Sequence, residues 1–224
     1  MLTLFTAIGH LTIQKNDKGT RIPIVKTGGQ EYALSTHELY LWSSLAFQIL
    51  TKEELQQIYH TQAKEHLRPN DSDFTYVLRR LLTRGIIVQG GGVTGVDALY
   101  RLFAQMHIVP VKASPFMRFS SCVRAWLHGH LPLTMLPRYL KKPTCTPLEA
   151  LILKLAEELS FSVAELLGYM EHSSELPSQT ALDAVTEQMK IDNLSEQVTL
   201  HHIQFPVLQG IANLYLRKQI LLER

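Results

Sequence analysis

The sequence has little cysteine and no long apolar run, and both absences limit what the protein can be. Cys122 and Cys145 are the only cysteines among 224 residues, and they are not closely spaced. Disulfide scaffolds and structural zinc sites use several cysteines at short, regular spacings, so neither class fits. No apolar run reaches the roughly 18–20 residues that span a bilayer. The first residues also lack the basic region of a signal peptide. We therefore expect a cytoplasmic protein without a transmembrane segment.

Sequence motifs for catalysis and metal binding are also missing. The chain has no nucleophile elbow, no H-E-x-x-H pair and no P-loop lysine. Two histidine groups, His128-Gly129-His130 and His201-His202, lack the i, i+4 spacing and the nearby Cys or Glu that metal sites favour. We expect neither an enzyme nor a metal or cofactor site.

Acidic residues are absent from one long segment. Residues 98–148 hold seven basic residues and no acidic one, whereas residues 149–224 hold five basic and 11 acidic residues. The overall net charge of +2 therefore hides a basic middle and an acidic end.

The basic residues of segment 112–142 alternate with aromatic ones, among them Phe116, Phe119 and Trp126. Uncompensated positive charge binds polyanions by releasing counterions, and a membrane surface is a second possible partner. The alternative is a linker whose charge is neutralised by the acidic end of the same chain. If the segment binds DNA, the residues expected to contact it are Arg118, Arg124, Lys141 and Lys142.

The elements that the sequence does contain begin with short strands and continue with helices. Residues 2–13 and 22–26 have the pattern of strands in a small β-meander. Ser35 and Glu38 form a capping box that begins a helix over 36–48, and a second helix begins at Thr51. A third helix over 73–83 should bury Phe74, Val77, Leu78 and Leu81 before Gly85 ends it.

The first two helices recur after 111 residues without a gap. This shift places Ser35 on Thr146 and Glu38 on Glu149, so that both capping boxes coincide. The third helix and its strand recur at a shift of 134, which places Arg84 on Lys218. We interpret the repeat as a duplicated module.

The third helix and the residues that follow it contain V-L-R-R-L-L-T-R-G-I-I, residues 77–87, and this pattern resembles the winged-helix family. The resemblance covers residues 35–95 and, more loosely, 146–224. It implies a helix 3 in the DNA major groove and a hairpin wing that touches the backbone or the minor groove. The family also includes members that bind proteins. The second copy lacks a wing and is acidic, which favours dimerisation or partner binding.

The glycines in Q-G-G-G-V-T-G, residues 89–95, allow two interpretations. G-x-G-x-x-G between a strand and a helix is a dinucleotide-binding pattern, but that site needs an acidic residue about 20 positions later, and none occurs. The winged-helix resemblance instead makes Gly90, Gly91 and Gly92 the tip of a wing, where positive φ angles are tolerated.

Together these observations predict an α+β fold with two tandem winged-helix-like modules. The expected parts are 1–111 with the meander and first module, a basic helical linker at 112–143, and a second module at 144–224. The expected function is a non-catalytic DNA-binding regulator that dimerises or binds a partner through 144–224. The alternative is a protein-binding adaptor. The predicted DNA contacts of the first module are Thr75, Tyr76, Arg79, Arg80, Thr83, Arg84, Gly91 and Gly92.

Overall fold

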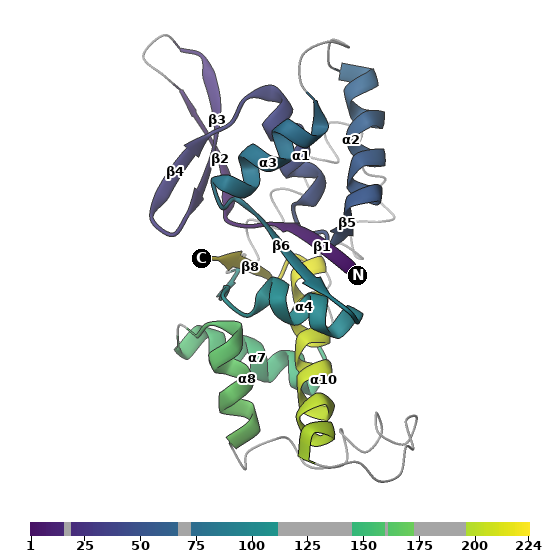
Figure 1. The fold of residues 1–224 in the computed structure, drawn as a ribbon. Coiled ribbons are helices and arrows are strands. Elements are labelled where there is room, and N and C mark those ends of the chain that lie inside the picture. Colours follow the sequence, from purple (N-terminus) through teal and green to yellow (C-terminus); the bar gives the residue numbers. More distant parts are fainter. Residues whose placement is uncertain (16–18, 67–72, 112–144, 160, 173–195) are drawn as a thin grey trace, which may run out of the picture.

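The computed structural model describes residues 1–15, 19–66, 73–111, 145–159, 161–172 and 196–224. The fold is α+β, with helices stacked on small antiparallel sheets. In Figure 1 a helical layer of α1 (Thr36–Leu45), α2 (Lys52–His66) and α3 (Phe74–Thr83) lies above the strands at the centre. A second layer lies below them: α4 (Gly95–Phe103), α7 (Pro147–Glu158), α8 (Val163–His172) and α10 (Glu196–Leu216).

The central sheet separates two hydrophobic cores. Strand β1 (Leu2–Ala7) pairs antiparallel with β5 (Leu50–Thr51) on one side and with β6 (Ile87–Gly92) on the other. Because successive side chains of a strand point to opposite faces, Phe5 and Ala7 join the core of α1–α3. Ile8 and Val88 join the core of α4, α7, α8 and α10.

A second sheet corrects the predicted start of the chain. The expected strand 2–13 is broken at Gly9, which has a φ of 80°. Residues after the break form β2 (His10–Lys15), which pairs with β3 (Arg21–Thr27), and β3 pairs with β4 (Gln30–Ala33). The meander therefore contains β2–β4, whereas residues 2–7 belong to the central sheet.

The two parts of the chain have the same order of elements and the same strand pairing. In the first unit, which we define as residues 2–92, Leu4 of the middle strand lies opposite Thr51 and Gly90. In the second unit, residues 107–223, His107 of β7 (His107–Pro110) lies opposite Ser162 and Glu223 of β8 (Ile220–Glu223). In the described residues, both units contain a strand, a helix, a short strand segment, two further helices and a last strand, in that order, and the first unit also contains β2–β4.

The ends of the third helices set the register of the repeat. Gly85 N–H donates to the Leu82 carbonyl at 3.0 Å, and Lys218 N–H donates to the Tyr215 carbonyl at 2.9 Å. Gly85 and Lys218 have φ angles of 69° and 59°, so both helices end in a left-handed residue. The structural shift is therefore 133, and Arg84 corresponds to Arg217. The predicted shift of 134 was wrong by one residue.

This register places a buried glutamate, paired with partly exposed arginine, in each unit. The Glu38 carboxylate, with its side chain only 2% exposed, lies 3.0 Å from Arg84 Nη1 and 3.1 Å from Arg80 Nε. Glu149, also 2% exposed, lies 3.2 Å from Arg217 Nη1. Both glutamates are also the capping residues of their helices, because they accept the backbone N–H groups of Ser35 and Thr146. Each pair therefore ties the start of the first helix to the end of the third.

We expect Glu38→Gln to lower the free energy of unfolding by about 2 kcal/mol, because hydrogen bonds to charged groups contribute about 1.5–3 kcal/mol. Glu149→Gln, which faces one arginine instead of two, should cost less. Urea unfolding followed by circular dichroism measures both. The matched control is Glu54→Gln, because Glu54 caps α2 through Thr51 but is exposed. A loss in the control as large as that of Glu38→Gln would contradict the prediction.

The two units share a core and are not separated by the basic segment. Strand β7 hydrogen-bonds to β8 from the other end of the chain, and α4 packs into the core of the second unit. The predicted boundary at residue 111 therefore divides a pair of bonded strands. In the sequence, segment 112–143 follows β7 and precedes α7, so it lies inside the second unit. The β2–β4 meander stands at the corresponding place of the first unit, between its middle strand and its first helix.

Tyr215 joins the two units. Its hydroxyl donates to the Ala7 carbonyl at 2.7 Å, accepts from Phe47 N–H at 3.0 Å, and lies 2.9 Å from Thr6 Oγ1. Its ring packs against Phe47 with the centroids 5.4 Å apart. Burial raises the pKa of the Tyr215 hydroxyl, so the group remains a neutral donor at ordinary pH.

Candidate functional site

Helix α3 has the buried and exposed faces that the sequence predicted. Phe74, Val77, Leu78 and Leu81 are buried, whereas Thr75, Tyr76, Arg79 and Thr83 are exposed. Asp73 caps the first turn by accepting Thr75 N–H, so a negative charge stands at the end of α3 where a phosphate would be attracted.

Arg80 and Arg84 contact the fold itself. Both lie on the carboxylate of Glu38, and Arg84 also donates to the Ala33 carbonyl of β4 at 3.2 Å. Using either guanidinium for DNA would leave a buried carboxylate short of its partners, which is costly. Among the arginines predicted on α3, Arg79 is therefore the one whose side chain has no such contact in the described structure.

The glycines after Gln89 do not form a wing. Gly90, Gly91 and Gly92 belong to β6, none of them has a positive φ, and the next element is helix α4. A Cβ on Gly90 would lie 2.3 Å from the Ala98 carbonyl oxygen, and one on Gly92 would lie 2.4 Å from Ala98 N. The glycines are therefore required for the close approach of α4. Gly92 is buried under that helix, which removes it as a DNA contact.

The geometry does not fit a dinucleotide site either. Strands β6 and β7, on either side of α4, lie in two different antiparallel sheets, whereas the dinucleotide fold places them parallel in one sheet. At the start of α4, Asp97 accepts Thr94 N–H and brings a carboxylate to the place of the pyrophosphate.

Several predicted residues lie outside the part of the chain that the structure describes. They are Arg118, Arg124, Lys141, Lys142, Cys122, His128 and His130. His201 and His202 lie in α10, but their side chains are not described. Cys145 is exposed, and its thiol donates to Gln219 Oε1 at 3.2 Å. Among the described residues, no cluster of three or more His, Cys, Asp or Glu could hold a metal ion.

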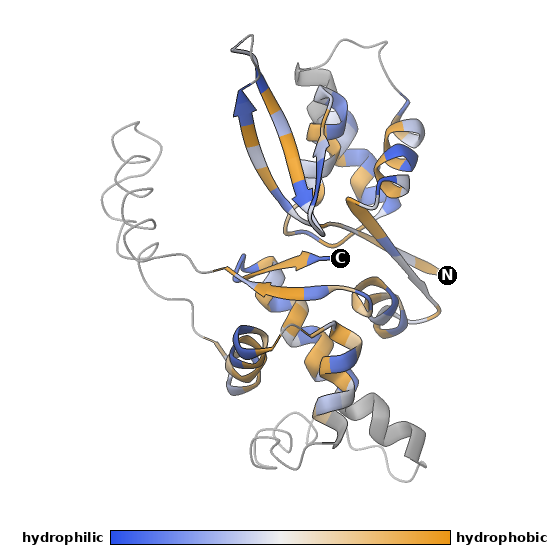
Figure 2. Cartoon of the chain, turned by 90° about the vertical axis from the view of Figure 1, so that its left-hand side faces the viewer, coloured by the Kyte–Doolittle hydropathy of each residue, from blue (hydrophilic) through white to orange (hydrophobic). Residues whose placement is uncertain are grey.

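Strand β2 is a surface feature that the sequence interpretation missed. In the described structure β2 pairs only with β3, so its other edge is open. Leu11 is 38% exposed and Ile13 is 65% exposed. They lie opposite Val25 and Pro23, and directly opposed residues share one face of a sheet. Hydrophobic and polar colours alternate along this ribbon in Figure 2. The alternation in H-L-T-I-Q-K could have revealed a strand with an apolar face, but not that this face is uncovered.

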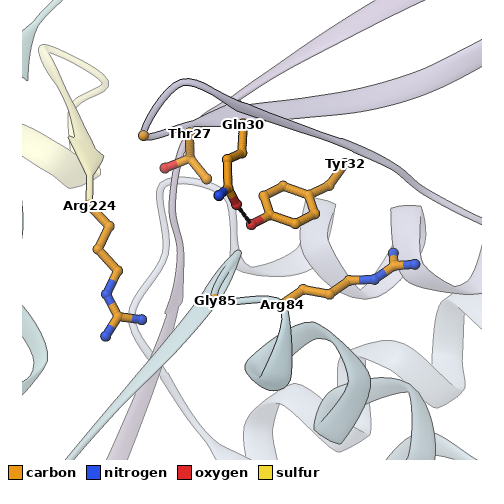
Figure 3. Close-up of a pocket in the computed structure, with 7 residues that line it drawn as sticks. Thr27, Gln30, Tyr32, Arg84, Gly85 and Arg224 are labelled. Atoms are coloured by element: carbon orange, nitrogen blue, oxygen red, sulfur yellow. Dashed lines mark hydrogen bonds between the residues drawn. The ribbon is translucent and has the colours of Figure 1, made fainter.

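A small pocket lies where the β3–β4 turn, the end of α3 and the last described residue meet. Its volume is about 260 Å³, and its wall includes Thr27, Gln30, Tyr32, Arg84 and Arg224. Figure 3 shows Tyr32 and Arg224 on opposite sides of it, with Gly85 between them. The guanidinium of Arg84 turns away towards Glu38, so Arg84 contributes its backbone and stem.

Comparisons with known proteins found no family model, no curated protein and no solved structure that matches this chain. Within the described part of the chain, no helix is both long and apolar enough to cross a membrane.

Proposed function

We propose that this chain is a non-catalytic adaptor that binds an extended segment of a partner protein along the open edge of β2. The observation that supports this proposal is an uncovered edge strand with two exposed apolar side chains, Leu11 and Ile13. An extended segment can continue such a sheet by main-chain hydrogen bonds, and its alternate side chains supply the specificity.

The backbone geometry of β2 supports this mode of binding. The face that carries Leu11 and Ile13 continues the face of Val25, which is fully buried in the core of the first unit. An apolar partner side chain would extend that core, and burial of apolar surface contributes roughly 25 cal/mol per Å². Natural proteins usually protect an open edge, and on β2 that protection is limited to Lys15 at its end.

The ion pairs of α3 favour the adaptor over the DNA-binding regulator. Sequence-independent DNA affinity comes from cations that neutralise phosphates. Arg80 and Arg84, which the DNA interpretation needs, are held by Glu38.

Selection of linear peptides from a displayed random library on the full chain tests the proposal. We expect recovered peptides with alternating apolar residues, and we expect Ile13→Lys to weaken their binding at least about tenfold by placing a charge in a buried contact. The matched control is Gln14→Lys, because Gln14 lies on the same strand, adds the same charge and points to the opposite face.

Equal binding of the selected peptides by Ile13→Lys and Gln14→Lys would overturn the site on β2.

Binding to a labelled DNA duplex tests the DNA-binding regulator. An affinity that falls steeply with salt and is lost in Arg79→Ala would support the regulator and contradict the adaptor.

A further inference from the structure

The main chain of Leu11 and Ile13 faces the open edge of β2. Pro23 lies opposite Ile13 and has no N–H, and its carbonyl accepts Leu34 N–H at 2.9 Å on the side of β4. The N–H and C=O of a strand residue point to the same side, and two directly opposed antiparallel residues point either both towards or both away from each other. The main chain of Ile13 therefore points away from β3, and so does that of Leu11, two residues earlier.

The side chains of the same two residues make this edge apolar. Leu11 is 38% exposed and Ile13 is 65% exposed, and both stand on the face of Val25, which is fully buried. Side chains at alternate positions of a strand share one face, so a strand that pairs with this edge meets both residues at once. The strand that fits best carries two apolar side chains at alternate positions, and β2 itself carries them.

A second copy of β2 fits this edge in one register. In an antiparallel pair, residues whose main chain faces the edge lie opposite one another, so odd-numbered residues of one copy meet odd-numbered residues of the other. With a two-fold axis at Thr12, Leu11 of each copy lies opposite Ile13 of the second copy, and both apolar positions are matched. A shift of two residues in one direction places Ile13 opposite Gly9. The same shift in the other direction places Leu11 opposite Lys15.

Charge also favours a second copy in this register. Each Lys15 lies opposite Gly9 of the second copy, so the two lysines stand six strand positions, or roughly 20 Å, apart. The N–H of Gly9 donates to the Leu222 carbonyl at 2.9 Å. The next residue, Glu223, has a side chain that is 31% exposed and lies 4.0 Å from His10 Nδ1. Each lysine therefore approaches a carboxylate of the other copy, and complementary charges of this kind fix the register of an interface.

We propose that two copies of this chain pair through their β2 edges, antiparallel and about a two-fold axis at Thr12, and that a partner segment must displace this pairing. The two meanders then join into one sheet with the strand order β4-β3-β2-β2-β3-β4. This inference rests on the same open edge as the proposed function, and it adds self-association as the regulation of that site. A contact of one short strand buries little surface, so the dimer is weak and depends on concentration.

Sedimentation of the full chain from micromolar to near-millimolar concentration tests the pairing. We expect a monomer–dimer equilibrium. Leu11→Glu or Ile13→Lys alone should weaken it at least about tenfold, because each places a charge opposite an apolar residue. A mixture of the two variants should dimerise again, because the register brings the new carboxylate at position 11 of one copy opposite the new ammonium at position 13 of the other.

The matched control is a mixture of Leu11→Glu with Leu11→Lys. It brings the same two charges together, but position 11 never lies opposite position 11 in this register, so the dimer should not return. Both substituted positions are partly or largely exposed, and recovery in the first mixture also shows that its variants are folded. Recovery in both mixtures, or in neither, would overturn the register, and a chain that stays monomeric at every concentration would overturn the pairing.

Peptide binding separates this inference from the proposed function. Peptides selected on the full chain should dissociate the dimer as they bind, since both use the edge of β2. Bound peptides on a chain that is always monomeric would contradict self-pairing and leave the adaptor proposal standing. A dimer with the predicted mixing behaviour from which no peptide is recovered would support self-pairing and contradict the adaptor. Peptides that bind without dissociating the dimer would overturn the regulation of the site by self-pairing.

Discussion

Gly90→Ala is expected to destabilise the protein by about 3 kcal/mol or more, at the upper end of what overpacking costs. The added Cβ would lie 2.3 Å from the Ala98 carbonyl oxygen and 2.4 Å from Leu102 N. Both are backbone atoms of α4, so the whole helix must move. Leu102 and Phe103 of the same helix are fully buried, and this movement would disturb the core of the second unit. Gly92→Ala should behave similarly, with its Cβ 2.4 Å from Ala98 N.

Gly91→Ala is the matched control within the same strand. Its Cβ would meet the end of the flexible Met1 side chain at 3.0 Å and no backbone atom closer than 4.0 Å. We expect a change within about 1 kcal/mol, because alanine also restricts the unfolded chain. Urea unfolding of the three variants measures the difference. Equal stabilities of Gly90→Ala and Gly91→Ala would show that α4 does not pack on β6 as described.

Tyr215→Phe is expected to cost about 2–4 kcal/mol, although it removes a single oxygen atom. The Ala7 carbonyl and the Phe47 N–H would both lose their partner in the interior, and each unpaired group costs about 1–3 kcal/mol. Thr6 keeps its hydrogen bond to the Gln48 carbonyl at 2.7 Å. Because these groups belong to the first unit and Tyr215 to the second, the change should loosen the contact between the units.

Two measurements separate this effect from a general loss of packing. Chemical denaturation gives the change in stability, and Tyr76→Phe is the control because that tyrosine is 61% exposed. Amide hydrogen exchange reports the site directly: we expect the Phe47 amide to be protected in the natural protein and to exchange much faster in Tyr215→Phe. Unchanged protection of Phe47 would contradict the role assigned to the hydroxyl.

Local features of the fold were predictable from the sequence. The capping boxes of Ser35 and Thr146 depend on residues three positions apart, and both are present in the structure. The buried face of α3 follows from the spacing of four apolar residues, and it was predicted correctly. Such features involve neighbours in the chain, so the pattern alone determines them.

Long-range pairing was not predictable from one sequence. The pattern of residues 2–13 contains no sign that β1 joins β6 rather than β2, or that β7 joins β8 from the other end of the chain. The register of the third helix was missed by one residue because Lys218 takes the left-handed conformation for which the first unit uses Gly85. The role of Arg80 and Arg84 was missed because their partner, Glu38, lies more than 40 residues away.

The sequence by itself determined the helices of this protein, their caps and the presence of a repeat, because these depend on short and regular spacings. Only the tertiary structure decided what the glycines of β6 and the arginines of α3 do. A glycine in the sequence indicates that there is no room for a side chain. A turn, a bound phosphate or a closely packed helix can each be the reason, and the sequence does not distinguish them. An arginine usually pairs with an anion. For Arg80 and Arg84 of α3, that anion is the buried carboxylate of Glu38 in the same chain.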